Sequence, residues 1–248
     1  MIKNKLAKQL TEMHNDLNRD LHPAFDMSKK EVLDYSFQFL NMNHVVELGG
    51  VGEIDCAYGL YVYDKFKPVQ LTMVDVQWTE NAKRLCAERK EITTMKVNFG
   101  DPKLPLFIGN VDTVILFDVL LHQVAPDWDR ILEMYAPYTR SFIICNPQFM
   151  ASSSTVRLLD LGKEEYFKNV PHPPTHPTYE TLFSRMDDLV EPGRTWRDAP
   201  NVWQWGITNK DLIQVMDQLG FQLAYLKNYG QWQNLSNFEH HSFLFYKK

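Results

Sequence analysis

The sequence predicts an α/β fold in which a mostly parallel seven-stranded sheet ends in an antiparallel strand pair and carries helices on both faces. Two short apolar runs end at carboxylates about 28 residues apart, Glu47 and Asp75, and runs of this kind are typical of strands buried in a parallel sheet. A glycine cluster, Gly49, Gly50 and Gly52, follows the first run. Such glycines let backbone approach a ligand, and a carboxylate at the next strand tip can accept hydrogen bonds from a ribose diol. The pair therefore predicts a nucleoside-binding half-sheet, with an ordinary glycine turn as the alternative.

Composition predicts a single globular domain over residues 1–248. The chain is 44% hydrophobic and 23% charged, and its net charge of −5 argues against a nucleic acid as the main partner. Cys56, Cys86 and Cys145 are odd in number and far apart, which fits reduced cysteines better than disulfides or a zinc knuckle. No signal-peptide core and no membrane-length apolar run is apparent, so we expect a cytoplasmic protein with no membrane partner. Oligomeric state is not readable from these features.

Residues 1–42 are expected to form an N-terminal helical cap. Apolar residues recur at steps of three and four between Leu6 and Leu21, and Pro23 ends this stripe. Ser28 with Glu31 matches a capping box, which predicts that a second helix begins there. These helices either cover the sheet or fold over a ligand.

Residues 52–145 alternate between helical and strand patterns. The expected order is a helix to residue 63, a strand at 70–76, a helix at 81–90, strands at 94–99 and 111–119, a helix at 128–135 and a strand at 141–145. Asn146 and Pro147 are expected to close this fifth strand. The alternation favours a parallel sheet with right-handed crossovers.

Residues 150–206 differ from the rest because they are rich in proline and histidine and then in tryptophan. We expect them to form an inserted lid between strands five and six. Thr208 and Asp211 then match a second capping box, and Gly220 marks the end of that helix. Strands follow at 221–229 and 241–246. Their connection of about ten residues is short for a parallel crossover, so the pair is predicted to be antiparallel.

Three segments match sequence motifs of one family. Val46–Gly49 and Val74–Val76 resemble its first two motifs, and Ile207–Phe221 resembles the helix before its last strand pair. Gly100–Asp101 and Asp118–His122 are weaker matches. From residue 45 to 246 the chain resembles the class I S-adenosylmethionine-dependent methyltransferases of the small-molecule type, which implies a Rossmann-like fold and S-adenosyl-L-methionine as the cofactor.

The resemblance also implies which residues contact the cofactor. Asp75 would hold the ribose, Trp78 would stack on the adenine with Val76 beside it, and Asp101 would lie near the adenine amine. Packing of Trp78 against the following helix is the alternative. The full set of implied cofactor-binding residues is Glu47, Gly49, Gly50, Gly52, Asp75, Val76, Trp78, Asp101 and Asp118.

One position departs from the family pattern. The family usually has glycines two, four and six residues after the acidic position, but here those positions are Gly49, Val51 and Glu53. Val51 would crowd the ligand unless the loop takes another path. A Rossmann dehydrogenase is the rival interpretation, but it also needs a third glycine, and the terminal antiparallel pair favours the methyltransferase.

The expected reaction is in-line transfer of a methyl group to an oxygen or nitrogen atom of a small molecule. A histidine or carboxylate can take the proton that leaves such an acceptor, and the candidates are His122, just beyond strand four, and His176 in the lid. A scaffold role is the alternative for His122. His172 and His176 have the spacing of a metal pair, but the prolines around them exclude a regular helix, so no metal site is predicted. The second hypothesis is a non-catalytic member of the same fold that binds a partner.

Overall fold

The computed structural model describes residues 24–52, 54–175, 179, 181–199 and 202–248. The predicted helix between Leu6 and Leu21 lies outside these residues. Within them, no helix combines the length and the apolar character that crossing a membrane requires.

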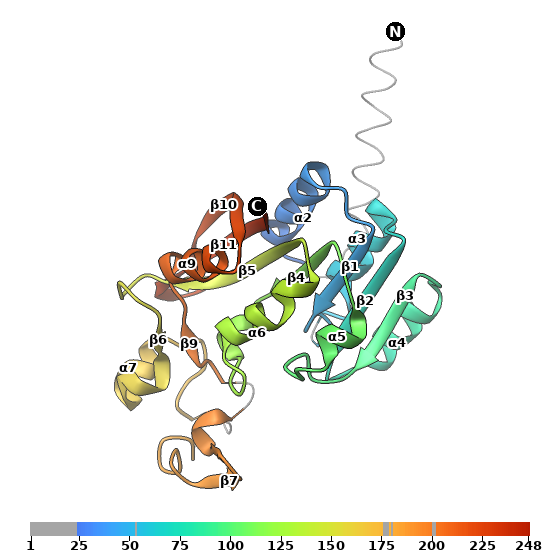
Figure 1. Ribbon diagram of the computed structural model, residues 1–248. Coiled ribbons are helices and arrows are strands. Elements are labelled where there is room, and N and C mark those ends of the chain that lie inside the picture. The colour runs from blue at the N-terminus through green and yellow to red at the C-terminus, as the bar shows by residue number, and fades with distance from the viewer. Residues whose placement is uncertain (1–23, 53, 176–178, 180, 200–201) are drawn as a thin grey trace.

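A seven-stranded sheet organises the molecule (Figure 1), in the order β10-β11-β5-β4-β1-β2-β3. Strands β1 to β5 pair in parallel, whereas β11 is antiparallel to both β5 and β10. The strands are β1 (His44–Leu48), β2 (Gln70–Asp75), β3 (Ile92–Lys96), β4 (Thr113–Phe117), β5 (Ser141–Phe149), β10 (Phe221–Trp232) and β11 (Leu235–Lys247). The predicted fold class is confirmed.

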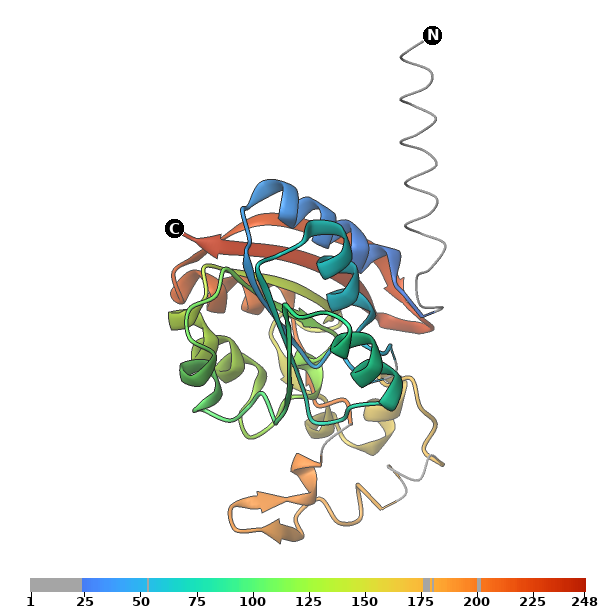
Figure 2. The same cartoon turned by 90° about the vertical axis from the view of Figure 1, so that its right-hand side faces the viewer.

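Helices cover both faces of the sheet (Figure 2). On one face lie α2 (Met27–Phe39), α3 (Ala57–Phe66) and α4 (Glu80–Ala87), and on the other α5 (Leu104–Ile108), α6 (Trp128–Tyr135) and α9 (Asn209–Gln218). Because successive strand residues point to opposite faces, Val45 belongs to the hydrophobic core under α2 and α3. Val46 belongs to the core under α6 and α9.

The fifth strand is longer than predicted. It continues through Asn146 and Pro147 to Phe149, whereas closure at Asn146 was expected. The Cys145 carbonyl accepts a hydrogen bond from Asp118 N, so Cys145 faces β4. Pro147, two residues on, faces the same side, where β4 has already ended at Phe117. Its missing N–H therefore leaves no ladder bond unmade.

The last strand pair is a tight hairpin, so the predicted ten-residue connection is wrong. Strands β10 and β11 extend to Trp232 and Leu235, and Gln233 turns the chain at a φ of +49°. Polar residues in this part hid the strand pattern. The extension matters because it carries His240 into the sheet beside Pro147.

Helix caps are only partly as predicted. Asp26, not Ser28, caps α2, because its carboxylate accepts from Ser28 N (2.7 Å) and Ser28 already lies inside the helix. Thr208 caps α9 as expected, accepting from Asp211 N (3.2 Å). The Asp211 carboxylate bonds to the backbone of Thr155 instead of returning to the cap, which ties α9 to the inserted segment.

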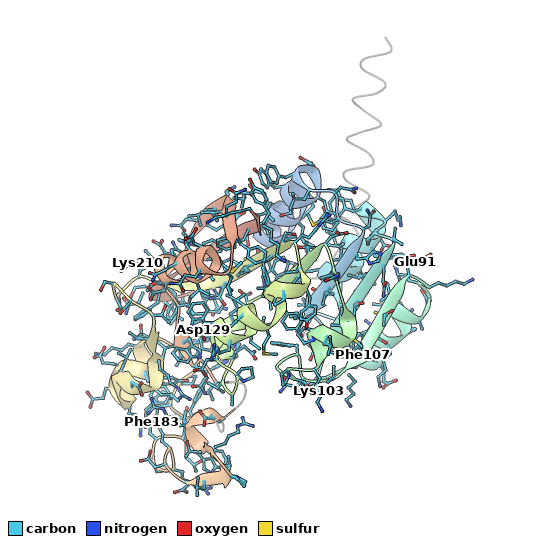
Figure 3. The ribbon with its side chains drawn as sticks, in the orientation of Figure 1. Glu91, Lys103, Phe107, Asp129, Phe183 and Lys210 are labelled. Carbon is cyan, nitrogen blue, oxygen red and sulfur yellow. The ribbon has the colours of Figure 1, made fainter. Side chains whose placement is uncertain are left out.

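The inserted segment (residues 150–206) lies on the side of the sheet toward which β1 and β3 point (Figure 1). Its described elements include β6 (Val156–Arg157), α7 (Lys163–Lys168), β7 (Leu189–Glu191), β8 (Arg194–Thr195) and β9 (Trp205–Gly206). Leu158, Tyr166 and Trp203 of the insertion form a third core with Phe149 and Phe238 of the sheet. In Figure 3, Phe183 of this segment and Glu91 before β3 mark opposite sides of the molecule.

Candidate active site

The glycine loop after β1 is packed tightly against its surroundings. Gly49 has a φ of +76°, and a Cβ there would lie 2.6 Å from Val119 Cγ1. A Cβ on Gly50 would lie 2.2 Å from Glu47 Cδ. Both positions therefore require glycine, whereas a Cβ on Gly52 would meet nothing within 4 Å.

Val51 does not line the open face of this loop. Its side chain is fully buried in the core under α2 and α3, and its N–H donates to Asp75 Oδ2 (3.0 Å). Val51 stands where the family usually has its second glycine. The loop directs this side chain into the core, so Val51 does not crowd a ligand.

Asp75 closes β2 beside the loop. It is only 8% exposed, and its Oδ1 accepts from Gln77 N (2.9 Å) while its Oδ2 accepts from Val51 N. Each carboxylate oxygen can accept more than one hydrogen bond, so the carboxylate is fixed in orientation with acceptor capacity remaining. Val76 next to it is exposed.

Glu47 is a buried acid at the end of β1. Neither carboxylate oxygen has a hydrogen-bond partner of good geometry among the described residues, and a Cβ on Gly59 would lie 2.5 Å from Oε2. Burial raises the pKa of Glu47 to about 8, although the Gly59 backbone and the Lys29 ammonium oppose the shift. The group is therefore mostly protonated near neutral pH.

Trp78 and Asp101 have local partners. The Trp78 indole N–H lies 3.2 Å from the carbonyl oxygens of both Asp75 and Met95, and its ring packs against the core under α2 and α3. This is the packing alternative, and stacking on an adenine stays a prediction. Asp101 is exposed and accepts from Lys103 N (2.9 Å) in the turn before α5.

A buried polar cluster, which the sequence did not predict as a whole, lies where β4 ends. It consists of Lys29 from α2, Asp118 after β4, Cys145 on β5 and His240 on β11. The Lys29 ammonium forms an ion pair with Asp118 Oδ2. His240 Nε2 lies 3.1 Å from Cys145 Sγ and 3.4 Å from Asp118 Oδ1. Asp118 has a φ of +54°, in the left-handed region that non-glycine residues rarely occupy.

Charges within the polar cluster stabilise one another. Burial alone would raise the pKa of Asp118, but Lys29 and His240 outweigh it and hold the pKa at about 2. Burial would lower the pKa of His240, but the neighbouring Asp118 and Cys145 raise it to about 10. The pKa of Lys29 is also raised, because the Asp118 carboxylate outweighs the effect of burial.

His122 follows β4 in a short 3₁₀ turn (Leu120–His122), next to the insertion. Its Nδ1 lies 3.0 Å from the Val202 carbonyl, and since a carbonyl only accepts, Nδ1 carries the proton. Burial lowers the pKa of His122, which favours the neutral ring with a free lone pair on Nε2. Gln204 N also donates to the Leu121 carbonyl (3.0 Å). The end of the insertion is thus bonded to the turn after β4.

His176 lies outside the described residues. The structure therefore brings Glu47, Gly49, Gly50 and Asp75 together at the carboxyl ends of β1 and β2, and it places Asp118 within the polar cluster.

The strand order, the parallel strands and the antiparallel C-terminal pair are those of the class I methyltransferases, and the chain has that fold. It is similar to a 1,6-didemethyltoxoflavin N1-methyltransferase from Burkholderia thailandensis, solved with its substrate and S-adenosylhomocysteine (13% identity, TM-score 0.55, covering 98% of this chain and 87% of that one). It is also similar to the N-terminal domain of EvdMO1 with S-adenosylhomocysteine bound (9% identity, TM-score 0.56, covering 98% of this chain and 97% of that one).

A magnesium protoporphyrin IX methyltransferase from Synechocystis PCC 6803, solved with S-adenosylmethionine, is a third similar structure (14% identity, TM-score 0.51, covering 90% of this chain and 79% of that one). No protein-family model and no curated protein matches the chain in sequence. At these identities the likeness is one of fold.

Proposed function

We propose that this protein is an S-adenosylmethionine-dependent methyltransferase that acts on an oxygen or nitrogen atom of a small molecule. The observation that carries the proposal is Asp75, a carboxylate held by two backbone N–H groups at the tip of β2 and beside a glycine loop. In a sheet of this order, ligands bind at the carboxyl ends of the strands.

The residues at this edge fit the cofactor. Asp75 retains acceptor capacity for the ribose hydroxyls, and exposed Val76 follows it. The Glu47 carboxyl, buried beneath Gly50, has no hydrogen-bond partner of good geometry among the described residues, so it keeps hydrogen-bonding capacity beside the glycine loop. When bound, S-adenosylmethionine supplies an already activated methyl group.

The protein's own contribution is alignment, exclusion of water and removal of a proton from the acceptor. His122 is suited to the last task, because its Nδ1 proton is held by the Val202 carbonyl and the neutral ring carries a lone pair on Nε2 that can accept a proton. The insertion supplies that carbonyl, so it also sets the orientation of the imidazole.

Several similar structures carry names of methyltransferases that act on small molecules, and the net charge of −5 supports the same acceptor class here. A cytoplasmic location is part of the proposal and follows from the reduced cysteines that the sequence predicts.

Cofactor binding by the Asp75→Ala variant tests the proposal. Removal of the carboxylate should weaken binding of S-adenosylmethionine by about 1.5–3 kcal/mol, or roughly 10- to 150-fold, the scale for losing hydrogen bonds to a charged group. Calorimetric titration of the wild type and the variant measures it directly. Asp217→Ala, an exposed carboxylate on α9, is the matched control and should bind as the wild type does.

Equal affinity in the wild type and Asp75→Ala, with both proteins folded, contradicts the assignment of Asp75. If the wild type does not bind S-adenosylmethionine or its demethylated product at all, the enzyme hypothesis is wrong. The alternative of a non-catalytic binding module then stands. The feature that favours it is the irregular glycine loop, in which the buried Val51 replaces a glycine.

A further inference from the structure

We propose that Asp118, Cys145 and His240 form a binding site for one divalent transition-metal ion, with zinc as the best match. The inference does not depend on the proposed methyl transfer, because Cys145 and His240 have no part in that reaction and metal binding can be measured without the cofactor. Asp118 is shared, since the family resemblance also implies it as a cofactor contact.

The three donor atoms already face a common point. One carboxylate oxygen, one sulfur and one imidazole nitrogen lie within 4.8 Å of one another. Cys145 Sγ is 3.1 Å and Asp118 Oδ1 is 3.4 Å from His240 Nε2. Zinc ligands stand about 2.0–2.3 Å from the ion, so tetrahedral neighbours are separated by about 3.3–3.8 Å. Small side-chain movements suffice to reach that geometry.

The ion would bind an atom that makes no hydrogen bond of good geometry among the described residues, although His240 Nε2 lies 3.4 Å from it. Asp118 Oδ1 is buried, and the described residues offer it no hydrogen bond of good geometry. The other oxygen, Oδ2, is occupied by the Lys29 ammonium. A carboxylate divided in this way can bind a metal through one oxygen and remain hydrogen-bonded through the other, as metal-binding carboxylates commonly do.

A second layer of polar groups orients the other two donors. His240 Nδ1 lies 3.3 Å from Ser28 Oγ and 3.6 Å from Asp26 Oδ2, which leaves Nε2 as the atom that faces the cluster. The Ser242 hydroxyl donates to Cys145 Sγ (3.1 Å), which fixes the position of the sulfur. Partners of this kind fix the tautomer of a ligating histidine and the orientation of its ring.

The donor set selects the class of metal. Sulfur and imidazole nitrogen favour zinc and similar transition metals, whereas magnesium and calcium require oxygen ligands. Three protein ligands leave one tetrahedral position for water or for a group of a bound molecule, which is the arrangement of reactive zinc sites. Binding replaces the protons on the thiol and the imidazole, so the site takes the ion with release of protons to solvent.

The test uses the full chain, stripped of metal with a chelator and titrated with zinc chloride in a calorimeter. One equivalent should bind. Cys145→Ala and His240→Gln should each weaken binding by more than about 100-fold, since loss of a second-layer partner alone weakens metal sites by about 10- to 100-fold. Ser28→Ala, which removes a second-layer partner of His240, should weaken zinc binding by about 10- to 100-fold.

Two variants serve as matched controls. Cys86 is another buried free cysteine, and His241 is the neighbour of His240 on β11 with partners on the opposite face, Asn209 and Glu239. Cys86→Ala and His241→Gln should therefore leave zinc affinity unchanged. If either control lowers affinity as much as Cys145→Ala does, the assigned ligands are wrong.

The wild-type protein offers a readout that does not depend on how the variants fold. Cobalt substituted for zinc should give a thiolate-to-metal charge-transfer band, and X-ray absorption at the zinc edge should find one sulfur neighbour. Absence of stoichiometric binding, or bound zinc with only nitrogen and oxygen neighbours, overturns the proposal.

Discussion

At the scale of single residues, Glu47 links the site to the stability of the fold. Its pKa is about 8 in the folded protein and 4.5 in the absence of burial. Below about 4.5 both the folded and the unfolded chain carry the proton. Between pH 4.5 and 8 only the folded chain keeps the proton on Glu47, so a rise in pH favours unfolding. Above pH 8 this loss of stability is complete.

The free energy of unfolding of the wild type should fall as pH rises from about 4.5 to about 8. We expect the Glu47→Gln variant to lack this fall, because glutamine does not ionise. The difference should be on the order of 3–5 kcal/mol at its upper bound, because each pKa unit corresponds to about 1.36 kcal/mol. Urea unfolding of both proteins across this range measures it. Glu88→Gln, an exposed glutamate, is the control. Parallel pH curves for the wild type and Glu47→Gln would contradict the assignment.

Sequence reasoning at this scale found the groups that end strands. Glu47, Asp75 and Asp118 are carboxylates directly after apolar runs, and a parallel sheet brings such ends to one edge. Lys29 and His240 lack that signal, since a lysine in an amphipathic helix and a histidine in a polar stretch usually face solvent. Only their packing between α2, β5 and β11 buries them.

At the scale of elements, the cap of α9 offers a local test. Thr208 accepts from Asp211 N, and the Asp211 carboxylate bonds to the Thr155 backbone, so this cap joins helix and insertion. Thr208→Ala should lower the free energy of unfolding by about 1 kcal/mol, the usual loss for an N-cap. Urea titration measures the loss, and Ser153→Ala in an exposed loop should show none. A neutral Thr208→Ala would mean that water replaces the cap without loss.

Element boundaries show where sequence patterns end. The helix predicted around residues 128–135 is found at Trp128–Tyr135, because its apolar face is uninterrupted. Strand β5 was predicted too short, since Pro147 is tolerated only because β4 ends at Phe117, opposite Cys145, and does not reach Pro147. Hairpin β10–β11 was predicted with too long a loop, because β10 is an edge strand and carries polar residues. Both errors depend on neighbours that are distant in the sequence.

At the scale of the whole molecule, the fold was predictable because its signals are local and repeated. Apolar runs, glycine ends and alternating helices each predict one unit, and right-handed crossovers leave few ways to join them. The polar cluster was not predictable in the same way. It joins residues of α2, β4, β5 and β11 that are separated by up to 211 positions, from Lys29 to His240, and no single stretch carries its pattern.

The insertion is the part of the molecule for which closure over a ligand is predicted. Its end is bonded to the turn after β4 through Val202 and Gln204, and Trp203 is buried against Phe238. The described residues between Lys163 and Arg197 are more often exposed. A segment anchored at its base and exposed beyond it can close over the carboxyl edge and exclude water.

We therefore expect hydrogen exchange between Pro171 and Trp205 to slow when S-adenosylhomocysteine and a methyl acceptor are bound together, and to slow less with either alone. Mass spectrometry of the full chain, with α6 peptides as the internal control, measures this. The gain in protection should be smaller beside Trp205 than farther from it, because Gln204 N is already hydrogen-bonded to the Leu121 carbonyl. If a methylated product forms while this stretch exchanges at the unliganded rate, the insertion is not a lid. The acceptor must then be held by α2, whose Lys29 already reaches the end of β4.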